Sequence, residues 1–251
     1  MKGLFYTFFY QPLMNILIVF YQIIPGGDFG VALILLTLLI RFFLYPLSVK
    51  GIKSQKAITE LQPKVKEIQE RYKDDKEKQA VEMMEVYKKA NISPFSGFVP
   101  FLIQLPVLVA LYRALRVFQS GEFSEVLYSF ISHPGEINSI FLGFMDLSTI
   151  GIFGDNGSFL IQNALIIFGA GIAQFIQMKM TSDYRPEVKK SKKRKNDLNT
   201  EMAEKMQKQM SYFLPFFTIF ILFKLPIAIG LYWITSTVFS LVQQYIIFKK
   251  S

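Results

Sequence analysis

A single arginine interrupts an apolar segment that is long enough to cross a lipid bilayer. Arg41 lies within residues 30–47, where almost all other side chains are aliphatic or aromatic. A transmembrane helix needs roughly 20 apolar residues, and an arginine near its centre costs about 2.5–3.5 kcal/mol on insertion scales. None of the other predicted spans contains Asp or Glu, so we expect no carboxylate at membrane depth to pair with this arginine. The segment therefore predicts a water-filled cavity inside the membrane. The alternative is a closed helix bundle whose carbonyl and amide groups satisfy the guanidinium.

The composition favours a polytopic membrane protein and excludes several kinds of chemistry. Apolar residues make up 51% of the 251 residues, and the net charge is +9. Because the charges cluster between apolar spans, membrane orientation explains them before nucleic-acid binding does. There is no cysteine and one histidine, His133, so disulfides, thiolate catalysis and zinc sites are not expected. Phosphate-binding loops and nucleophile–base pairs are also missing. We expect no cofactor, no metal and no enzymatic activity.

The expected fold is all-α: a five-helix transmembrane core with a cytoplasmic helical hairpin and an N-terminal interfacial amphipathic helix. The expected segments are residues 1–28 (interfacial), 29–49 (first span), 50–96 (hairpin), 97–118 (second span), 119–157 (extracytoplasmic loop), 158–180 (third span), 181–209 (basic cytoplasmic loop), 210–224 (fourth span), 225–248 (fifth span) and 249–251 (cytoplasmic tail).

The N-terminal segment 4–24 has two open placements. Gln11, Pro12 and Asn15 break its apolar run, and together with Gln22 they favour a helix that lies flat at the interface. A sixth span is the alternative. No small-residue cleavage site follows the segment, so we expect it to stay in the mature chain.

The polar insert 50–96 shows helical periodicity. Apolar residues recur at three- and four-residue steps in two arms, at Ile58, Leu61, Val65, Ile68 and Tyr72 and then at Ala80, Met84 and Tyr87. Asp74-Asp75-Lys76 is the expected turn, and Pro63 is expected to kink or restart the first arm. A solvated helical pair that merely links two spans is the alternative.

Insert 50–96 and loop 181–209 are rich in Lys and Arg, whereas residues 119–157 have none, so the positive-inside rule places both segments and the C-terminus in the cytoplasm.

Several polar side chains are expected at the depth of Arg41. On the last span, Ser236, Ser240, Gln243 and Gln244 follow a three-to-four-residue spacing that predicts one polar stripe. Trp233 is either an interfacial anchor or a residue at the cavity mouth. Our candidate groove residues are Arg41, Gln104, Asn163, Gln174, Trp233, Ser236, Ser240 and Gln243.

Four stretches resemble the YidC/Oxa1/Alb3 family of membrane protein insertases. They are Gly30–Ala32 with Arg41–Leu47, Ser54–Ala57 with Leu61–Pro63, Pro100–Leu108, and Leu225–Trp233 continuing to Gln243–Tyr245. They occur in the family's order and cover most of residues 29–248.

The resemblance implies five core helices around a groove that opens to the cytoplasm and to lipid and is closed on the outside. It matches Arg41 to the groove arginine, Gln104 to the glutamine of the proline-flanked second helix, and Trp233 to the aromatic residue of the last helix. The basic run of Lys189, Lys190, Lys192, Lys193, Arg194 and Lys195 lies where some relatives contact the ribosome. The implied partners are nascent membrane proteins, the ribosome and the bilayer, while the sequence leaves contact with the Sec translocon open. The large extracytoplasmic domain of Gram-negative members and a lipoprotein signal are not present in this sequence.

We therefore expect a membrane protein insertase of the bacterial plasma membrane that passes polar tails or loops of nascent chains through a hydrophilic groove. A small solute transporter or channel that uses the same pocket is the main alternative. A scaffold that binds anionic lipid or ribosomal RNA through Lys189–Lys195 is a second one.

Overall fold

The chain folds into long helices arranged between two polar ends. The computed structural model describes residues 3–91, 93, 99–123, 126–154, 156–183 and 213–249. Its helices are η1 (Tyr6–Tyr10), α1 (Gln11–Ile23), α2 (Phe29–Phe43), α3 (Tyr45–Arg71), α4 (Lys76–Lys89), α5 (Val99–Ser120), α6 (Ile161–Asp183), a short helix Phe213–Leu222, and α8 (Ile227–Lys249). Two short antiparallel strands, β1 (Ile140–Phe141) and β2 (Met145–Asp146), lie between α5 and α6.

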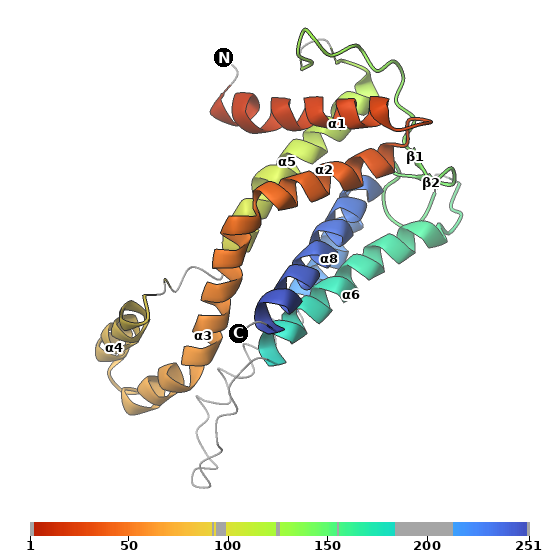
Figure 1. Cartoon of the computed structure of the whole chain (residues 1–251). Helices are drawn as coiled ribbons and strands as arrows, with labels where there is room; N and C mark the ends of the chain where they lie inside the picture. Colours follow the sequence, from red (N-terminus) through yellow and green to blue (C-terminus); the bar gives the residue numbers. More distant parts are fainter. Residues whose placement is uncertain are drawn as a thin grey trace.

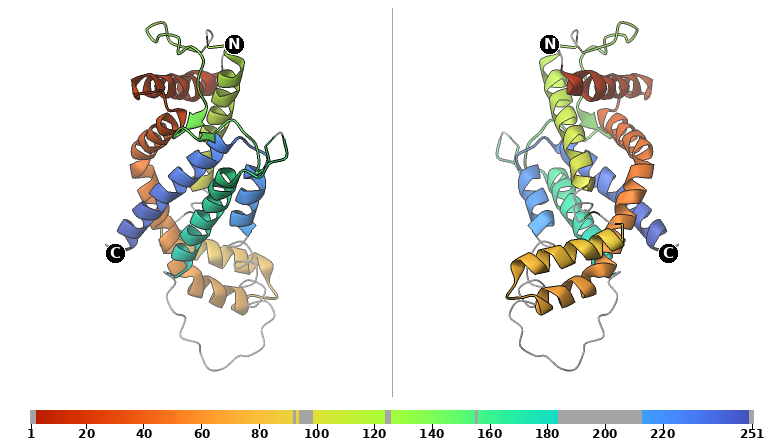
Figure 2. Two further views of the ribbon diagram at one scale, coloured as in Figure 1. Left: turned by 90° about the vertical axis from the view of Figure 1, so that its right-hand side faces the viewer. Right: turned by 90° about the vertical axis from the view of Figure 1, so that its left-hand side faces the viewer.

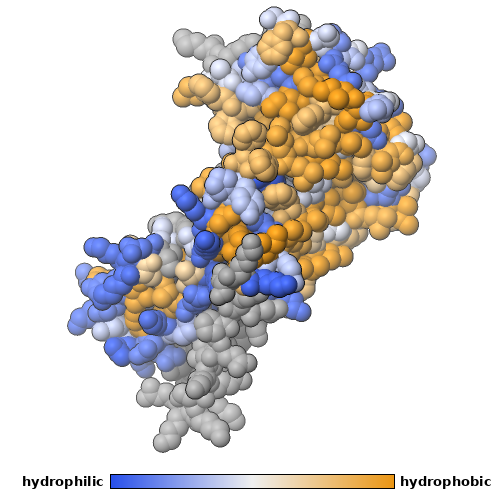
Figure 3. Space-filling view, in the orientation of Figure 1, coloured by the Kyte–Doolittle hydropathy of each residue, from blue (hydrophilic) through white to orange (hydrophobic). Residues whose placement is uncertain are grey.

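Figures 1 and 2 show the helical hairpin of α3 and α4 at one end of the molecule and α1 across the opposite end. Helices α2, α5, α6 and α8 run between these ends, and α8 packs on both α2 and α6. Hydrophobic residues cover the face over α1, α2 and the neighbouring core in Figure 3, whereas hydrophilic residues gather over α3 and α4. This division is typical of a membrane-embedded core that carries a water-exposed hairpin.

Among the residues that the structure describes, two helices are long and apolar enough to cross a bilayer, namely Ile161–Thr181 and Ile227–Lys249. The bent pair α2–α3 makes a third if it is counted as one span, and Phe213–Leu222 is apolar but short. The structure is therefore that of a mostly helical membrane protein. The five-span interpretation stays a prediction.

The predicted first span is broken at a point where no break was expected. Asp28 caps the start of α2, because its carboxylate accepts a hydrogen bond from the Val31 backbone N–H at 2.9 Å. It ends at Leu44, and α3 continues at an angle of 67°. Pro46 lies in the first turn of α3, where its missing N–H is tolerated, but its ring would collide with the backbone if α2 continued straight. Residues 45–49 consequently belong to α3 and not to the apolar helix before it.

Helices α3 and α4 form the polar pair at the hairpin end. The turn between them ends at Asp75, which caps α4 by accepting a hydrogen bond from the Lys78 backbone N–H at 3.0 Å. The Gln79 side chain donates to the Gln69 carbonyl across the pair at 2.9 Å. Helix α3 runs without interruption through Pro63, so the helix does not restart there.

Small residues set the spacing of the core helices. A Cβ on Gly230 of α8 would lie 2.7 Å from the Ile166 Cγ2 of α6, and one on Gly171 would lie 2.5 Å from the Ile219 side chain. Both distances are too short for real contacts, so the helices approach more closely than any larger residue would permit. Ala170, next to Gly171, is fully buried in the same contact region.

The segment between α5 and α6 is tied to three helices, α1, α2 and α8. It accepts backbone hydrogen bonds from Ile227 and Ala228 at the start of α8. The Asp28 carboxylate accepts from the Leu142 N–H at 2.7 Å, and the Asn15 amide of α1 bonds both the Val126 carbonyl and the Tyr128 N–H. These contacts hold α1 across the helix ends, while its predicted placement flat at the membrane interface stays a prediction.

Candidate functional site

Arg41 lies in the last turn of α2 and faces α8 and α5. Its Nε donates a hydrogen bond to Ser236 Oγ at 2.8 Å, and Nη2 donates to Ser236 Oγ and, at 3.1 Å, to Gln104 Oε1. The buried Tyr232 interacts with the same group of side chains. Two helices, α5 and α8, thus supply neutral oxygen acceptors to one guanidinium of α2. No carboxylate of the described residues lies within 4.0 Å of it.

A small polar cavity adjoins Arg41 on the side of the α2–α3 bend. Its volume is about 50 Å³, and a single water needs roughly 10–15 Å³ measured this way, so the cavity has room for several waters. Its lining residues come from α2, the α2–α3 bend, α3, α6 and α8 and are Arg41, Leu44, Leu47, Ser48, Gly51, Ile52, Gln55, Gln177, Ser240 and Gln244.

The predicted polar stripe of α8 faces this region. Ser240 lines the cavity, and Gln243 is tied to the bend because its Oε1 accepts from Ser48 Oγ at 2.7 Å while its Nε2 donates to the Tyr45 carbonyl. Gln244 is 2% exposed, and its Oε1 has no hydrogen-bond partner among the residues that the structure describes. A buried acceptor without a partner costs about 1–3 kcal/mol, so this oxygen is a place for water or another donor.

Two predicted groove residues form a separate cluster. Gln174 Oε1 of α6 accepts a hydrogen bond from Trp233 Nε1 at 3.2 Å and another from Thr218 Oγ1 at 2.6 Å. Trp233 therefore contacts α6 and the helix Phe213–Leu222, and it does not line the cavity beside Arg41.

Asn163 lies at the other end of the core. Its side-chain amide donates to Thr149 Oγ1 and to the Gly151 carbonyl, both at 2.9 Å, so it fastens the loop between α5 and α6. The structure thus brings Arg41, Gln104, Ser236, Ser240 and Gln243 together. It places Asn163, Gln174 and Trp233 elsewhere.

Several residues that line the cavity were not predicted from the sequence. Ser48 was placed at the end of the first span and Gln55 in the hairpin, because no bend was expected at Leu44. Gln177 of α6 also lines the cavity and is not among the predicted groove residues. The spacing Arg41–Ser48–Gln55, at seven-residue intervals, is a signal that would have pointed to one helical face. The basic run Lys189–Lys195 lies outside the described residues.

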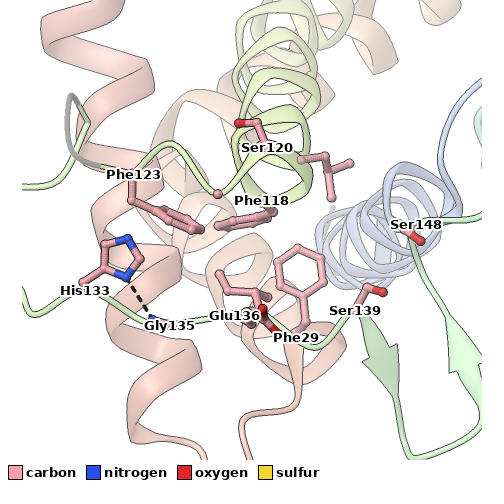
Figure 4. Close-up of a pocket in the computed structure, with 12 residues that line it drawn as sticks. Phe29, Phe118, Ser120, Phe123, His133, Gly135, Glu136, Ser139 and Ser148 are labelled. Carbon is pink, nitrogen blue, oxygen red and sulfur yellow. Dashed lines mark hydrogen bonds between the residues drawn. The ribbon is translucent and has the colours of Figure 1, made fainter.

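A larger cavity, of about 680 Å³, lies at the opposite end of the core from the hairpin. Figure 4 shows aromatic rings from α2, α5 and the following loop around it, with His133 and Glu136 on the loop. His133 packs edge-on against Phe123 at 5.1 Å and accepts a hydrogen bond from the Gly135 N–H. No cluster of three or more metal-ligating side chains occurs among the described residues. This cavity is larger, but Arg41 and the polar stripe face the smaller one.

Two carboxylates outside the apolar core have lowered pKa values. Burial alone would raise the pKa of Asp146 in the loop, but hydrogen bonds from Ser139 and Ser148 outweigh it and lower the pKa. On the hairpin, the hydrogen bond and charge of Lys89 lower the pKa of Glu85. Neither carboxylate is a hydrogen-bond partner of Arg41, whose partners are the neutral side chains of Ser236 and Gln104.

Comparison with known proteins gives consistent matches. Residues 19–251 match the family described as 60Kd inner membrane protein. The chain is 34% identical over 245 residues to the membrane protein insertase YidC of Wolinella succinogenes, 34% identical over 257 residues to that of Beijerinckia indica, and 30% identical over 246 residues to that of Endomicrobium trichonymphae. These alignments cover 98%, 99% and 98% of this chain but 38%, 38% and 40% of the relatives. The chain therefore spans about two-fifths of the length of these relatives.

Proposed function

Because this chain belongs to the 60Kd inner membrane protein family, whose members include proteins named membrane protein insertase, we propose that it inserts nascent membrane proteins into the bilayer. The observation that carries the proposal is the Arg41 site. A guanidinium at the end of an apolar helix is surrounded by neutral acceptors and adjoins a cavity with room for water. Such a group attracts anionic segments without being neutralised by its own protein.

The polar cavity lowers the barrier that a polar client segment meets in the membrane. A short N-terminal tail or a hairpin loop enters from the hairpin side, and Arg41 and the side-chain amides replace part of its hydration. The barrier falls most for clients with acidic tails, because a charge-assisted hydrogen bond to Arg41 contributes about 1.5–3 kcal/mol. The client's apolar helix then moves into lipid, where each central Leu, Ile, Phe or Val contributes about 0.3–0.6 kcal/mol.

No chemical energy source is needed for this reaction. Partition of the client helix drives it, and a membrane potential that is positive outside adds about 2.3 kcal/mol per acidic charge per 100 mV. We place the chain as a multi-pass protein of the bacterial plasma membrane, with the α3–α4 hairpin and the C-terminus in the cytoplasm, because these segments carry the Lys and Arg residues.

Reconstitution tests this function against the transporter or channel alternative. Proteoliposomes of the purified chain should insert a single-span client with a short acidic tail, without nucleotide, at a rate well above that of empty liposomes. They should release no trapped small solute in the absence of client. Solute release without client, together with a client insertion rate equal to that of empty liposomes, would support the transporter or channel.

The basic run Lys189–Lys195 supports an accessory contact with the ribosome. Seven successive residues carry six positive charges, and such runs bind nucleic-acid phosphate in a salt-dependent way. Deleting residues 189–195 should weaken co-sedimentation with ribosomes at low salt, whereas 0.5 M salt should abolish the difference between the two chains. Equal co-sedimentation at low salt would reject the contact.

A further inference from the structure

Two arginines lie on the lipid side of α5 at the end that carries α1. Arg113 and Arg116 are exposed and are three residues apart, so they share one helix face. Between residues 97 and 178 they are the only Lys or Arg residues in the sequence. No carboxylate of the described residues lies within 4.0 Å of either guanidinium. The function proposed above uses neither residue.

Their surroundings show that this face meets lipid. Val109 and Tyr112 on the same helix are 42% and 39% exposed, and Phe8 and Phe9 on η1 are 69% and 48% exposed. Large apolar side chains that remain uncovered on a membrane protein are solvated by acyl chains. The two guanidinium groups therefore lie at the edge of a lipid-covered surface and need polar partners from outside the described part of the chain.

The depth of the pair corresponds to the headgroup region. Arg116 and Arg113 precede Ser120, the end of α5, by four and seven residues, which is about 6 Å and 10 Å along the helix axis. Helices that lie in the interface are buried about 5–10 Å below the headgroup boundary. The guanidinium of Arg113 packs over the Phe5 ring, 5.7 Å from its centroid, which fixes its position next to this N-terminal helix. Stacking occupies one face of the guanidinium and leaves its N–H groups free to donate at the edge.

We propose that Arg113 and Arg116 bind the phosphate group of an anionic phospholipid in the leaflet that contains α1. Two arginines at this spacing present paired N–H donors, the geometry that phosphate oxygens accept in bidentate fashion. Such a lipid would neutralise the positive charges at an end of the molecule whose loop is otherwise acidic or neutral. It would also hold η1 and α5 together through the Phe5–Arg113 contact. The inference uses the membrane placement of α1 and α5 but does not depend on insertase activity.

Fluorescence quenching by lipid tests the proposal. The chain has no cysteine, so a single Val109→Cys variant takes a fluorophore one turn from Arg113. The labelled protein is placed in nanodiscs that contain a small fraction of nitroxide-labelled phosphatidylglycerol or nitroxide-labelled phosphatidylcholine. Because each basic residue near a membrane surface favours an anionic lipid about fivefold, we expect clearly stronger quenching by the anionic lipid. Equal quenching by the two lipids would overturn the proposal.

Variants identify the residues responsible. In the same labelled background, Arg113→Gln/Arg116→Gln should bring the quenching ratio close to one, and Arg113→Lys/Arg116→Lys should keep part of the preference. The matched control is Lys73→Gln/Lys78→Gln, which removes two exposed positive charges from the hairpin and should leave the ratio unchanged. An unchanged ratio in the Arg113→Gln/Arg116→Gln variant would contradict the assignment.

A salt titration tests the same contact without relying on the folding of an arginine variant. In labelled protein that keeps both arginines, 1 M salt should reduce the preference for the anionic lipid, because salt screens the charges. No client protein is present, so the outcome is independent of the proposed insertase function.

Discussion

At the scale of single residues, the chemistry of the core rests on how Arg41 is solvated. Ser236 and Gln104 supply neutral oxygen atoms, so the guanidinium keeps its full positive charge and its attraction for anions. A carboxylate partner would have stabilised the arginine at the expense of that attraction. The arrangement is therefore suited to transient contacts with acidic groups rather than to a permanent ion pair.

Replacing Arg41 should separate clients by the charge of their translocated tails. Arg41→Ala should slow the insertion of a client with an acidic tail by roughly tenfold to a hundredfold, since a hydrogen bond to a charged group contributes about 1.5–3 kcal/mol. Clients with neutral tails should change much less, and Arg41→Lys should retain most of the activity because it keeps the charge. Insertion in proteoliposomes measures these rates, with Arg71→Ala on the hairpin as the control. Equal activity of the Arg41→Ala variant on all clients would remove Arg41 from the mechanism.

The loop carboxylate Asp146 should make stability depend on pH. Its Oδ1 accepts hydrogen bonds from Ser139 Oγ at 2.7 Å and from the Ser148 N–H at 2.9 Å, and its pKa lies below the ordinary value of 3.8. A lowered pKa means that the carboxylate contributes stability above about pH 4 and that this contribution is lost as the pH falls through the folded-state pKa.

The difference in thermal stability between the wild type and Asp146→Asn measures this contribution and cancels the titration of the other carboxylates. We expect the wild type to be more stable at pH 7 and the difference to shrink below pH 4. A difference that stays constant down to pH 3 would show that the charge of Asp146 does not matter.

At the scale of helices, the close approach of α6 and α8 depends on glycine. Gly230 faces Ile166 at a distance where any side chain would collide. This contact fixes the rotation of α8, and that rotation turns Ser236 toward Arg41 and Trp233 toward Gln174. Packing at one glycine thus helps to determine which polar side chains meet within the next two turns of α8.

Gly230→Ala should therefore destabilise the protein by about 1–3 kcal/mol, the usual cost of overpacking a core. Gly51→Ala is the matched control, because a Cβ at this helical position meets nothing within 4 Å and alanine favours helix by up to about 1 kcal/mol. Thermal unfolding in detergent compares the two variants. Adding Ile166→Ala to Gly230→Ala should recover part of the loss. If the two glycine variants proved equally stable, the contact would not control the helix spacing.

At the scale of the whole molecule, the two ends differ. At the end that carries α1, the loop between α5 and α6 contacts the starts of α2, α6 and α8, whereas the cavity beside Arg41 adjoins the bend that leads into the hairpin. An insertase requires access from the side of synthesis without a leak through the membrane, and this asymmetry supports such a role.

Sided labelling tests that asymmetry. In the cysteine-free chain, Ser240→Cys places a thiol in the cavity, and Ala170→Cys places one at a fully buried core position as control. A membrane-impermeant, water-soluble thiol reagent should label position 240 in inverted vesicles and not in right-side-out vesicles, while position 170 should stay unlabelled in both. Labelling of position 240 from both sides would indicate a pore and favour the channel alternative.

The sequence by itself determined the helical class, the need to solvate Arg41, and the polar stripe on the last helix, because hydrophobicity and helical spacing are local properties. It also pointed to Ser236 and Gln104 through the stripe and the family resemblance. Only the tertiary structure decided that α2 bends at Leu44, which brings Ser48 and Gln55 to the cavity. It also decided that Trp233 faces Gln174, although Trp233 lies only about 60° around the helix from Ser236. Asn163 likewise donates its hydrogen bonds to the loop between α5 and α6 and not to the site around Arg41. The physical reason is that spacing along one helix fixes which residues share a face, whereas packing between helices fixes what that face meets.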